Sequence, residues 1–210
     1  MMSLTDQLKW RYATKKFDST KRLSAEQLDY LLEAIQLAPS SYGLQHYKVI
    51  VVENPEVRAK LREAAYGQPQ VTDASQLIVF AAETNIDEAY VKSFVDLVAE
   101  TRNVSRESLA GLEGMVLGGI ANRTPEQLLL WAQKQAYIAL GILLAAVAAE
   151  GIDAVPMEGF DPAKFDEILG LKEKGLTATV IAAVGFRAED DAYSKLVKVR
   201  RPQSELFIHI

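Results

Sequence analysis

The stretch from Ala136 to Ala149, AYIALGILLAAVAA, is the most apolar part of the chain and carries no charged residue. It is shorter than the run of roughly 18 apolar residues that marks a membrane-spanning helix. A helix that is apolar all round needs protein on nearly every side. We therefore interpret this stretch as a buried core helix, and we expect a dimer interface to supply part of its cover.

The composition is that of an ordinary globular protein. Of the 210 residues, 49% are hydrophobic and 24% are charged, with a formal net charge of -5 and no cysteine. This length favours one compact domain over residues 1–210. The missing cysteines exclude a disulfide-framed secreted domain, a thiolate zinc site, an iron-sulfur cluster and a cysteine nucleophile.

The charge balance narrows the class of partner. A pI near 5.2 argues against a nucleic-acid protein, because duplex binding needs clustered Lys and Arg residues. The opening residues, MMSLTDQLKWRYATKKF, are charged early and lack the apolar segment of a secretory signal. We expect a cytoplasmic protein with no membrane partner.

Helix starts are well marked along the chain. Ser24 with Gln27 resembles a capping box, and the helix that follows stops at Pro39. Three further starts place an N-cap residue before a proline at the first helical position. These starts are Asn54-Pro55, Thr124-Pro125 and Asp161-Pro162, and long helical patterns cover roughly residues 86–102 and 124–150.

Short runs rich in β-branched residues predict buried strands between these helices. They cover residues 47–53, 77–82 and 177–186, and residues 152–155 are a weaker candidate. The predicted fold class is α/β or α+β, with more helix than strand.

The familiar catalytic motifs are missing. The chain has no GxGxxG, no GxxxxGK[ST] and no GxSxG. Its only histidines are His46 and His209, so a histidine-rich metal site cannot be assembled and we expect no metal. His209 should be solvated, while His46 in a loop has a minor chance of contacting a ligand.

Two basic segments carry cations two or four positions apart. The first covers residues 11–15 (RYATK), and the second covers residues 198–202 (KVRRP). If both segments are extended, Arg11 shares one side with Lys15, and Lys198 shares one side with Arg200. Four cations at one place would suit a phosphate. Spacing alone favours the alternative of two separate solvated basic stretches.

Two loops could also approach a ligand. Residues 38–45 (APSSYGLQ) offer two hydroxyls and an amide, although a helix stop and a turn explain them equally well. Residues 155–160 (VPMEGF) follow a short strand, where proline and glycine let the backbone approach a planar ligand. Glu158 there is either a base or an exposed acid.

Taken together, these segments resemble the FMN-dependent nitroreductase family, above all the oxygen-insensitive NAD(P)H nitroreductases and dihydropteridine reductases of bacteria. The resemblance covers nearly the whole chain and depends on seven segments in this order. They are RYATKKFD (11–18), LAPSSYGLQ (37–45), TDASQLIVF (72–80), WAQKQAYIALG (131–141), GIDAVPMEGFD (151–161), GLKEKG (170–175) and KVRRP (198–202).

The resemblance implies an α+β fold with a mainly antiparallel central sheet flanked by helices, in an intertwined homodimer with FMN at the interface. It implies that Arg11, Lys15, Lys198 and Arg200 hold the phosphate and the polar edge of the flavin, beside Tyr12 and Ala13 of the same segment. Pro39, Ser40 and Ser41 would come from the other subunit. Pro156, Met157, Glu158 and Gly159 would lie against the flavin ring, and Gln70 would reach the flavin or its substrate.

Some positions depart from the family pattern. Gly67 replaces an Asn that contacts the flavin in many relatives, so Gln68 or Gln70 would have to supply that contact. Gly43 and His46-Tyr47 also differ, and Ala13 replaces a Ser. The segment from about Val104 to Thr124, which lines the substrate channel in relatives, is the least similar, so substrate choice stays open.

The implied activity is ping-pong hydride transfer from NADH or NADPH through flavin N5 to a nitroaromatic, quinone or related small acceptor. No side chain is required as an acid or base, because the cofactor carries the chemistry. Two alternatives stay open: a flavin-binding protein with other flavin chemistry, such as dehalogenation or flavin fragmentation, or with no reductase turnover, and a helical interaction module without flavin.

Overall fold

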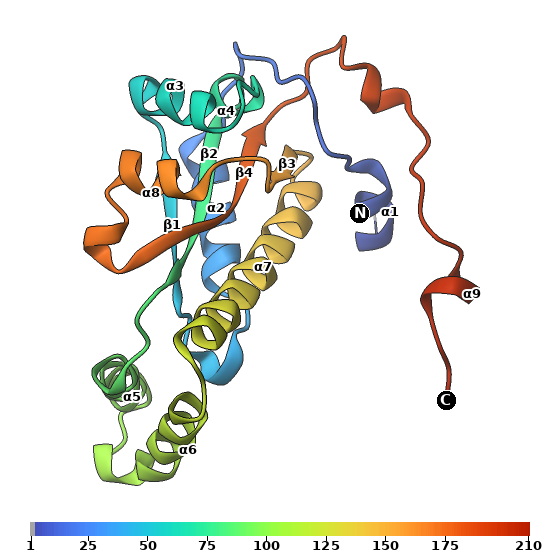
Figure 1. The fold of residues 1–210 in the computed structure, drawn as a ribbon. Helices are drawn as coiled ribbons and strands as arrows, with labels where there is room; N and C mark the ends of the chain where they lie inside the picture. The colour runs from blue at the N-terminus through green and yellow to red at the C-terminus, as the bar shows by residue number, and fades with distance from the viewer. Residues whose placement is uncertain (1–2) are drawn as a thin grey trace.

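A four-stranded sheet lies between two layers of helices in the computed structural model, which describes residues 3–210 (Figure 1). The strand order is β1-β2-β4-β3, and each neighbouring pair is antiparallel. The prediction of an α+β fold with an antiparallel sheet is confirmed, and so is the weaker fourth strand. The strands are β1 (Tyr47–Val52), β2 (Gln76–Glu83), β3 (Asp153–Met157) and β4 (Leu176–Gly185).

The central strands are buried because helices cover both of their faces. In β2, Leu77 and Val79 belong to the core on one face, and Ile78 and Phe80 to the core on the other. This explains why β2 and β4 have continuous apolar sequences instead of alternating ones. The prediction of a buried strand was wrong for β1, which forms one edge of the sheet, is half-buried and exposes Lys48.

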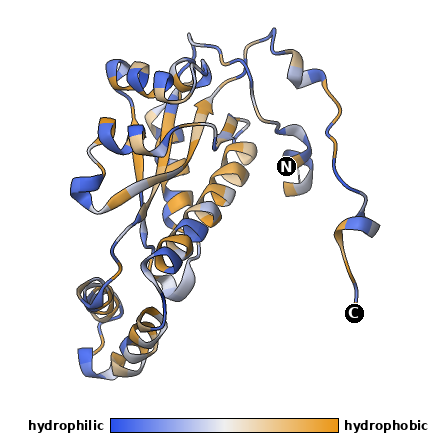
Figure 2. Cartoon of the chain, viewed as in Figure 1, coloured by the Kyte–Doolittle hydropathy of each residue, from blue (hydrophilic) through white to orange (hydrophobic). Residues whose placement is uncertain are grey.

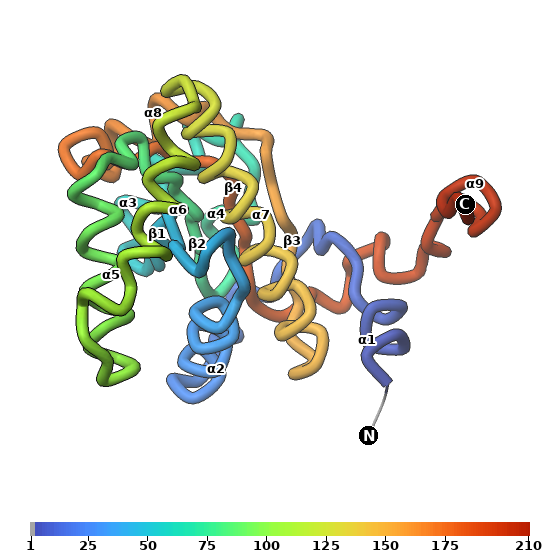
Figure 3. The backbone as a smooth tube through the Cα atoms, turned by 90° about the horizontal axis from the view of Figure 1, so that it is seen from below, coloured from blue at the N-terminus to red at the C-terminus, as the bar shows by residue number. Residues whose placement is uncertain are grey.

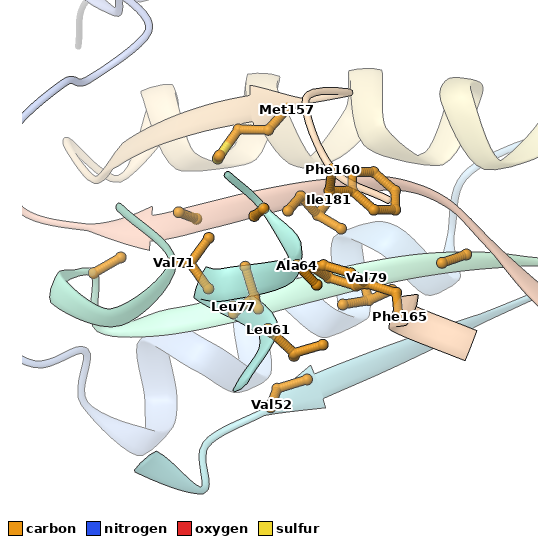
Figure 4. Close-up of a cluster of buried hydrophobic side chains, with 14 of the residues drawn as sticks. Val52, Leu61, Ala64, Val71, Leu77, Val79, Met157, Phe160, Phe165 and Ile181 are labelled. Atoms are coloured by element: carbon orange, nitrogen blue, oxygen red, sulfur yellow. The ribbon is translucent and has the colours of Figure 1, made fainter. Parts of the chain in front are cut away.

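One face of the sheet is covered by α3 (Pro55–Ala64), α4 (Gln70–Asp73) and α8 (Pro162–Leu169). Figure 4 shows Leu61 of α3 and Phe165 of α8 packed against side chains of the sheet. Asn54 and Asp161 cap α3 and α8 with their side chains, and proline follows each cap. Both predicted starts are confirmed.

The other face is covered by α2 (Ala25–Gln36) and α7 (Pro125–Ala149). Both begin with a capping box, at Ser24 and Thr124. The sequence predicted the box at Ser24 and an N-cap at Thr124, and both predictions are confirmed. The helix that contains the apolar stretch is 25 residues long, so by length and composition alone it could cross a membrane. Its inner side is nevertheless fully buried at Ala139, Leu143 and Val147, as expected of a core helix.

The outer side of α7 is partly exposed in the single chain. Leu130, Tyr137 and Ile138 keep 51%, 39% and 41% of their surface exposed. Near its N-terminal end, α7 also packs with α5 (Glu88–Arg102) and α6 (Ala110–Ala121), which extend below the sheet in Figure 1.

Both ends of the described chain lie to one side of the sheet (Figures 1 and 3). The N-terminal end is α1 (Leu4–Trp10), and the C-terminal segment contains α9 (Gln203–Leu206). Apolar residues recur along this C-terminal segment (Figure 2), and Val197, Val199 and Ile208 are 89%, 85% and 87% exposed.

Candidate functional site

The first basic segment is aligned by the edge strand β3. Ala13 forms a parallel bridge with Ala154 of β3, and the Thr14 side chain is fully buried. Because successive side chains of an extended segment alternate, Arg11 and Lys15 lie on the side opposite Thr14. The sequence predicted this sharing of one side from the spacing alone.

The second basic segment returns to the first one. Lys198 Nζ donates hydrogen bonds to the carbonyl oxygens of Leu8, at 2.6 Å, and of Arg11. The two segments thereby enclose a pocket of about 500 Å³, and all four predicted cations line it. The alternative of two separate solvated stretches does not describe this arrangement. The lining residues are Lys9, Trp10, Arg11, Tyr12, Ala13, Lys15, Pro156, Tyr193, Ser194, Leu196, Val197, Lys198 and Arg200.

We call this pocket the cation pocket. The positive charges that line it repel one another. Burial, followed by the charges of Arg11 and Arg200, lowers the pKa of Lys198 below its ordinary value. Burial and then Arg200 likewise lower the pKa of Arg11, although Asp153 opposes this. Arg11 Nε is buried and has no hydrogen-bond partner within residues 3–210. An anion in the pocket would relieve the repulsion and supply that partner.

The end of β3 leads from the cation pocket to a second pocket. Pro156 lines both, and Met157, Glu158 and Tyr137 line the second, of about 420 Å³. No hydrogen bond from the backbone N–H groups of Glu158 and Gly159 is found within the described part of the chain. These groups are therefore available to a ligand's acceptor atoms.

The Glu158 side chain is held toward α7. The Tyr137 hydroxyl donates a hydrogen bond to Glu158 Oε1 at 2.5 Å. Burial, together with this bond, raises the pKa of Tyr137 to about 12. The tyrosine therefore stays protonated at neutral pH and anchors the carboxylate.

Gln68 lies beside this strand end, and Gln70 follows Gln68 closely in sequence. Gln68 Nε2 donates to the carbonyl oxygen of Gly159 at 2.6 Å, so Gln68 lies directly beside the predicted ligand-binding backbone. Gln70, at the start of α4, is buried, and its Oε1 has no hydrogen-bond partner among the described residues. Gly67 has a φ of +75°, and a Cβ there would meet no atom within 4 Å.

The loop of Pro39, Ser40 and Ser41 is not part of this assembly within one chain. It follows α2 at the end of that helix far from α1 in Figure 1. Ser40 Oγ accepts a hydrogen bond from Gln45 N at 3.0 Å, and Ser41 N donates to Gln135 Oε1 of α7 at 2.9 Å. None of the three residues lines the cation pocket.

Neither histidine lines the cation pocket or the second pocket. His46 is fully buried against the Trp131 ring, with the ring centroids 4.0 Å apart. Burial, and then the charge of Arg123, lowers the pKa of His46 to about 4. His209 is exposed, as predicted.

Sequence reasoning missed Trp10, Tyr193 and Asp191. Trp10 and Tyr193 line the cation pocket, and Asp191 accepts hydrogen bonds from its walls. The one available signal was local: Asp191 and Tyr193 lie in the short turn that precedes the second basic segment.

Comparisons with known proteins agree with this architecture. The family model described as "Nitroreductase family" matches residues 8–186. The oxygen-insensitive NAD(P)H nitroreductase of Enterobacter cloacae is 36% identical over 207 residues, covering 93% of this chain and 94% of that protein.

Solved structures share the fold. The ydfN structure from Bacillus subtilis has a TM-score of 0.87 at 21% identity, with 98% of each chain covered. A structure from Exiguobacterium sibiricum in complex with FMN has a TM-score of 0.86 at 19% identity, covering 100% of this chain and 98% of that one. At these identities the likeness shows the fold alone. The family model and the curated relative decide the membership: this chain belongs to the nitroreductase family.

Proposed function

We propose that this protein is an FMN-dependent NAD(P)H oxidoreductase that reduces nitroaromatics, quinones or related small acceptors by a ping-pong mechanism. The observation that carries the proposal is the convergence of Arg11, Lys15, Lys198 and Arg200 on one pocket beside the end of β3. The names of the curated relatives support NADH or NADPH as the reductant.

The residues of the cation pocket fit the polar part of FMN. Arg11, Lys198 and Arg200 would hold the phosphate, which supplies the acceptor that the buried Arg11 Nε lacks. The pocket volume, about 500 Å³, lies within the ~300–1,000 Å³ usual for small-molecule sites. The fold is also that of a protein solved with FMN.

The isoalloxazine ring would lie along the strand end from Pro156 to Gly159. When bound, FMN supplies hydride chemistry at N5, so no side chain must act as acid or base. The free N–H groups of Glu158 and Gly159 would donate to the ring edge. Lys15 would stabilise negative charge on the reduced ring, and Gln70 would offer its unpaired Oε1 to the ring or the acceptor.

We propose further that the site is completed in a homodimer. Pro39, Ser40 and Ser41 lie away from the cation pocket of their own chain, so only a second copy can bring them to it. The edge strand β1 is open on its outer side, and a groove of about 670 Å³ lies between it and α2. The apolar C-terminal segment, residues 196–210, has the chemistry to cover such a groove on a second copy.

The region around α6 would border the acceptor. Its glycines Gly111, Gly114 and Gly118 have open space where a Cβ would be, and Met115 is 62% exposed. An apolar, side-chain-poor surface of this kind suits a planar aromatic acceptor. A single domain over residues 1–210 and a cytoplasmic location remain predictions.

The test is an absorbance spectrum of the purified protein after FMN is added and the excess removed, followed by anaerobic titration with NADH or NADPH. We expect bound oxidised flavin that bleaches on titration and recovers with a quinone or nitroaromatic. Flavin that binds but never bleaches would favour other flavin chemistry. A protein that binds no flavin would contradict the proposal.

A further inference from the structure

Asp191 is a buried carboxylate in the wall of the cation pocket. It is 2% exposed and forms no salt bridge within residues 3–210. Its Oδ2 accepts hydrogen bonds from the Tyr12 hydroxyl at 2.8 Å, from Lys15 N at 2.9 Å and from Lys16 N at 3.1 Å. Its Oδ1 accepts one from Tyr193 N at 3.0 Å.

These bonds fix three residues that line the pocket. Tyr12 and Lys15 come from the first basic segment, and Tyr193 comes from the turn before the second one. Lys15 Nζ lies 5.7 Å from the centroid of the Tyr193 ring. The Asp191 carboxylate therefore joins the first basic segment to the turn before the second one. It fixes the positions of the Tyr193 ring and of Lys15.

The charge of Asp191 acts against the expected ligand. Burial alone would raise the pKa of Asp191, but the N–H groups of Lys15 and Lys16 and the Tyr12 hydroxyl hold it below its ordinary value. The group is therefore an anion at neutral pH, and it lies next to a pocket suited to a phosphate. Electrostatics alone would make its removal favourable for an anionic ligand. Loss of the hydrogen bonds would be unfavourable, because the walls would lose their fixed orientation.

We infer that Asp191 is a positioning residue that holds Tyr12, Lys15 and Tyr193 in the orientation that binds FMN. This inference depends on the proposed function for its ligand. The hydrogen-bond geometry carries it: both backbone N–H groups and the tyrosine hydroxyl converge on a single oxygen, Oδ2.

The test compares two neighbouring aspartates. The amide of Asp191→Asn accepts hydrogen bonds through one oxygen only, so it cannot keep both the three bonds made to Oδ2 and the bond from Tyr193 N to Oδ1. We expect the dissociation constant for FMN, measured by quenching of flavin fluorescence, to rise roughly tenfold, although the variant removes a negative charge. Asp190→Asn is the matched control, since Asp190 is exposed and pairs only with Lys16 among the described residues. It should bind FMN as the wild type does.

A second readout does not use FMN. Hydrogen exchange in the protein without flavin should be faster in Asp191→Asn at the amides that face the new NH2 group, either Lys15 and Lys16 or Tyr193, and unchanged in Asp190→Asn. Tyr12→Phe removes one bond only and should weaken FMN binding by a smaller factor, roughly threefold. It covers the case in which Asp191→Asn does not fold.

Three results would overturn the inference. The first is tighter or unchanged FMN binding by a folded Asp191→Asn protein, and the second is unchanged exchange at all three amides, those of Lys15, Lys16 and Tyr193. The third is an unfolded Asp191→Asn protein together with unchanged FMN binding by Tyr12→Phe. If the wild-type protein binds no FMN, the proposed function fails separately, and the amide exchange still decides whether Asp191 orders the segment.

Discussion

The cation pocket and the loop of Pro39–Ser41 contrast sharply, although the same family resemblance predicted both. The pocket is assembled within one chain, because a bridge from Ala13 to β3 and the bonds of Lys198 bring its two segments together. The loop is anchored elsewhere, to Gln135 of α7. The difference teaches that one copy of this chain assembles the cation pocket by itself but does not bring the loop to it.

Removing the end of the C-terminal segment, residues 203–210, should have the largest effect on this contrast. Deletion of residues 203–210 removes Phe207 and Ile208, which are 56% and 87% exposed and which we expect to cover a second copy. The truncated chain should run as a monomer in sedimentation analysis and lose FMN binding. The substitution Glu205→Gln, in the same segment, is the control. A truncated protein that stays dimeric with full flavin would show that the segment does not hold the dimer.

His46 beside the loop should make stability depend on pH. Its pKa is about 4 in the folded chain, against an ordinary 6.5, so the unfolded chain binds the proton between these values. Stability should therefore fall as the pH drops from 6.5 towards 4, by up to about 3 kcal/mol. Denaturant unfolding at several pH values measures this.

The substitution His46→Phe keeps a ring against Trp131 and should remove that part of the pH dependence. His209→Phe, at the exposed C-terminus, should leave it in place. Equal pH dependence in wild type and His46→Phe would show that His46 is not the buried neutral group.

Removing a single cation of the pocket should have a smaller effect than the two changes above. Arg200→Met should weaken FMN binding by about 2 kcal/mol, or roughly 30-fold, the usual value of a hydrogen bond to a charged group. Arg201→Met is the matched control, because Arg201 is 77% exposed at its side chain and does not line the pocket. Equal losses in the two variants would point to a general charge effect, contrary to a specific phosphate contact.

The smallest effect is expected at Tyr137. The substitution Tyr137→Phe frees the Glu158 carboxylate from α7 and lets its negative charge approach the ring site. Flavin reduction, followed by stopped flow, should slow by roughly threefold. Tyr30→Phe, on the exposed side of α2, is the control. A faster or unchanged rate would show that this hydrogen bond does not keep the charge away.

The parts of the fold that depend on neighbours in sequence were predictable. Caps such as Ser24 and Thr124 are local, and the periodicity of a buried strand is visible in its own residues. The edge position of β1 was not visible, because it depends on which strands pair. The spacing of Arg11 and Lys15 predicted a shared side, but Asp191 lies 176 residues beyond Lys15, and no local pattern links them.

Subunit mixing tests the central claim most directly. One parent carries Lys198→Met and Arg200→Met in the cation pocket, and the other carries Pro39→Trp on the exposed loop. Each parent alone should bind FMN poorly. If each site combines the pocket of one copy with the loop of the other, a mixed dimer has one site with both parts intact, and mixing should restore FMN binding. A mixture that binds no more FMN than its parents would contradict the claim that two copies build the site.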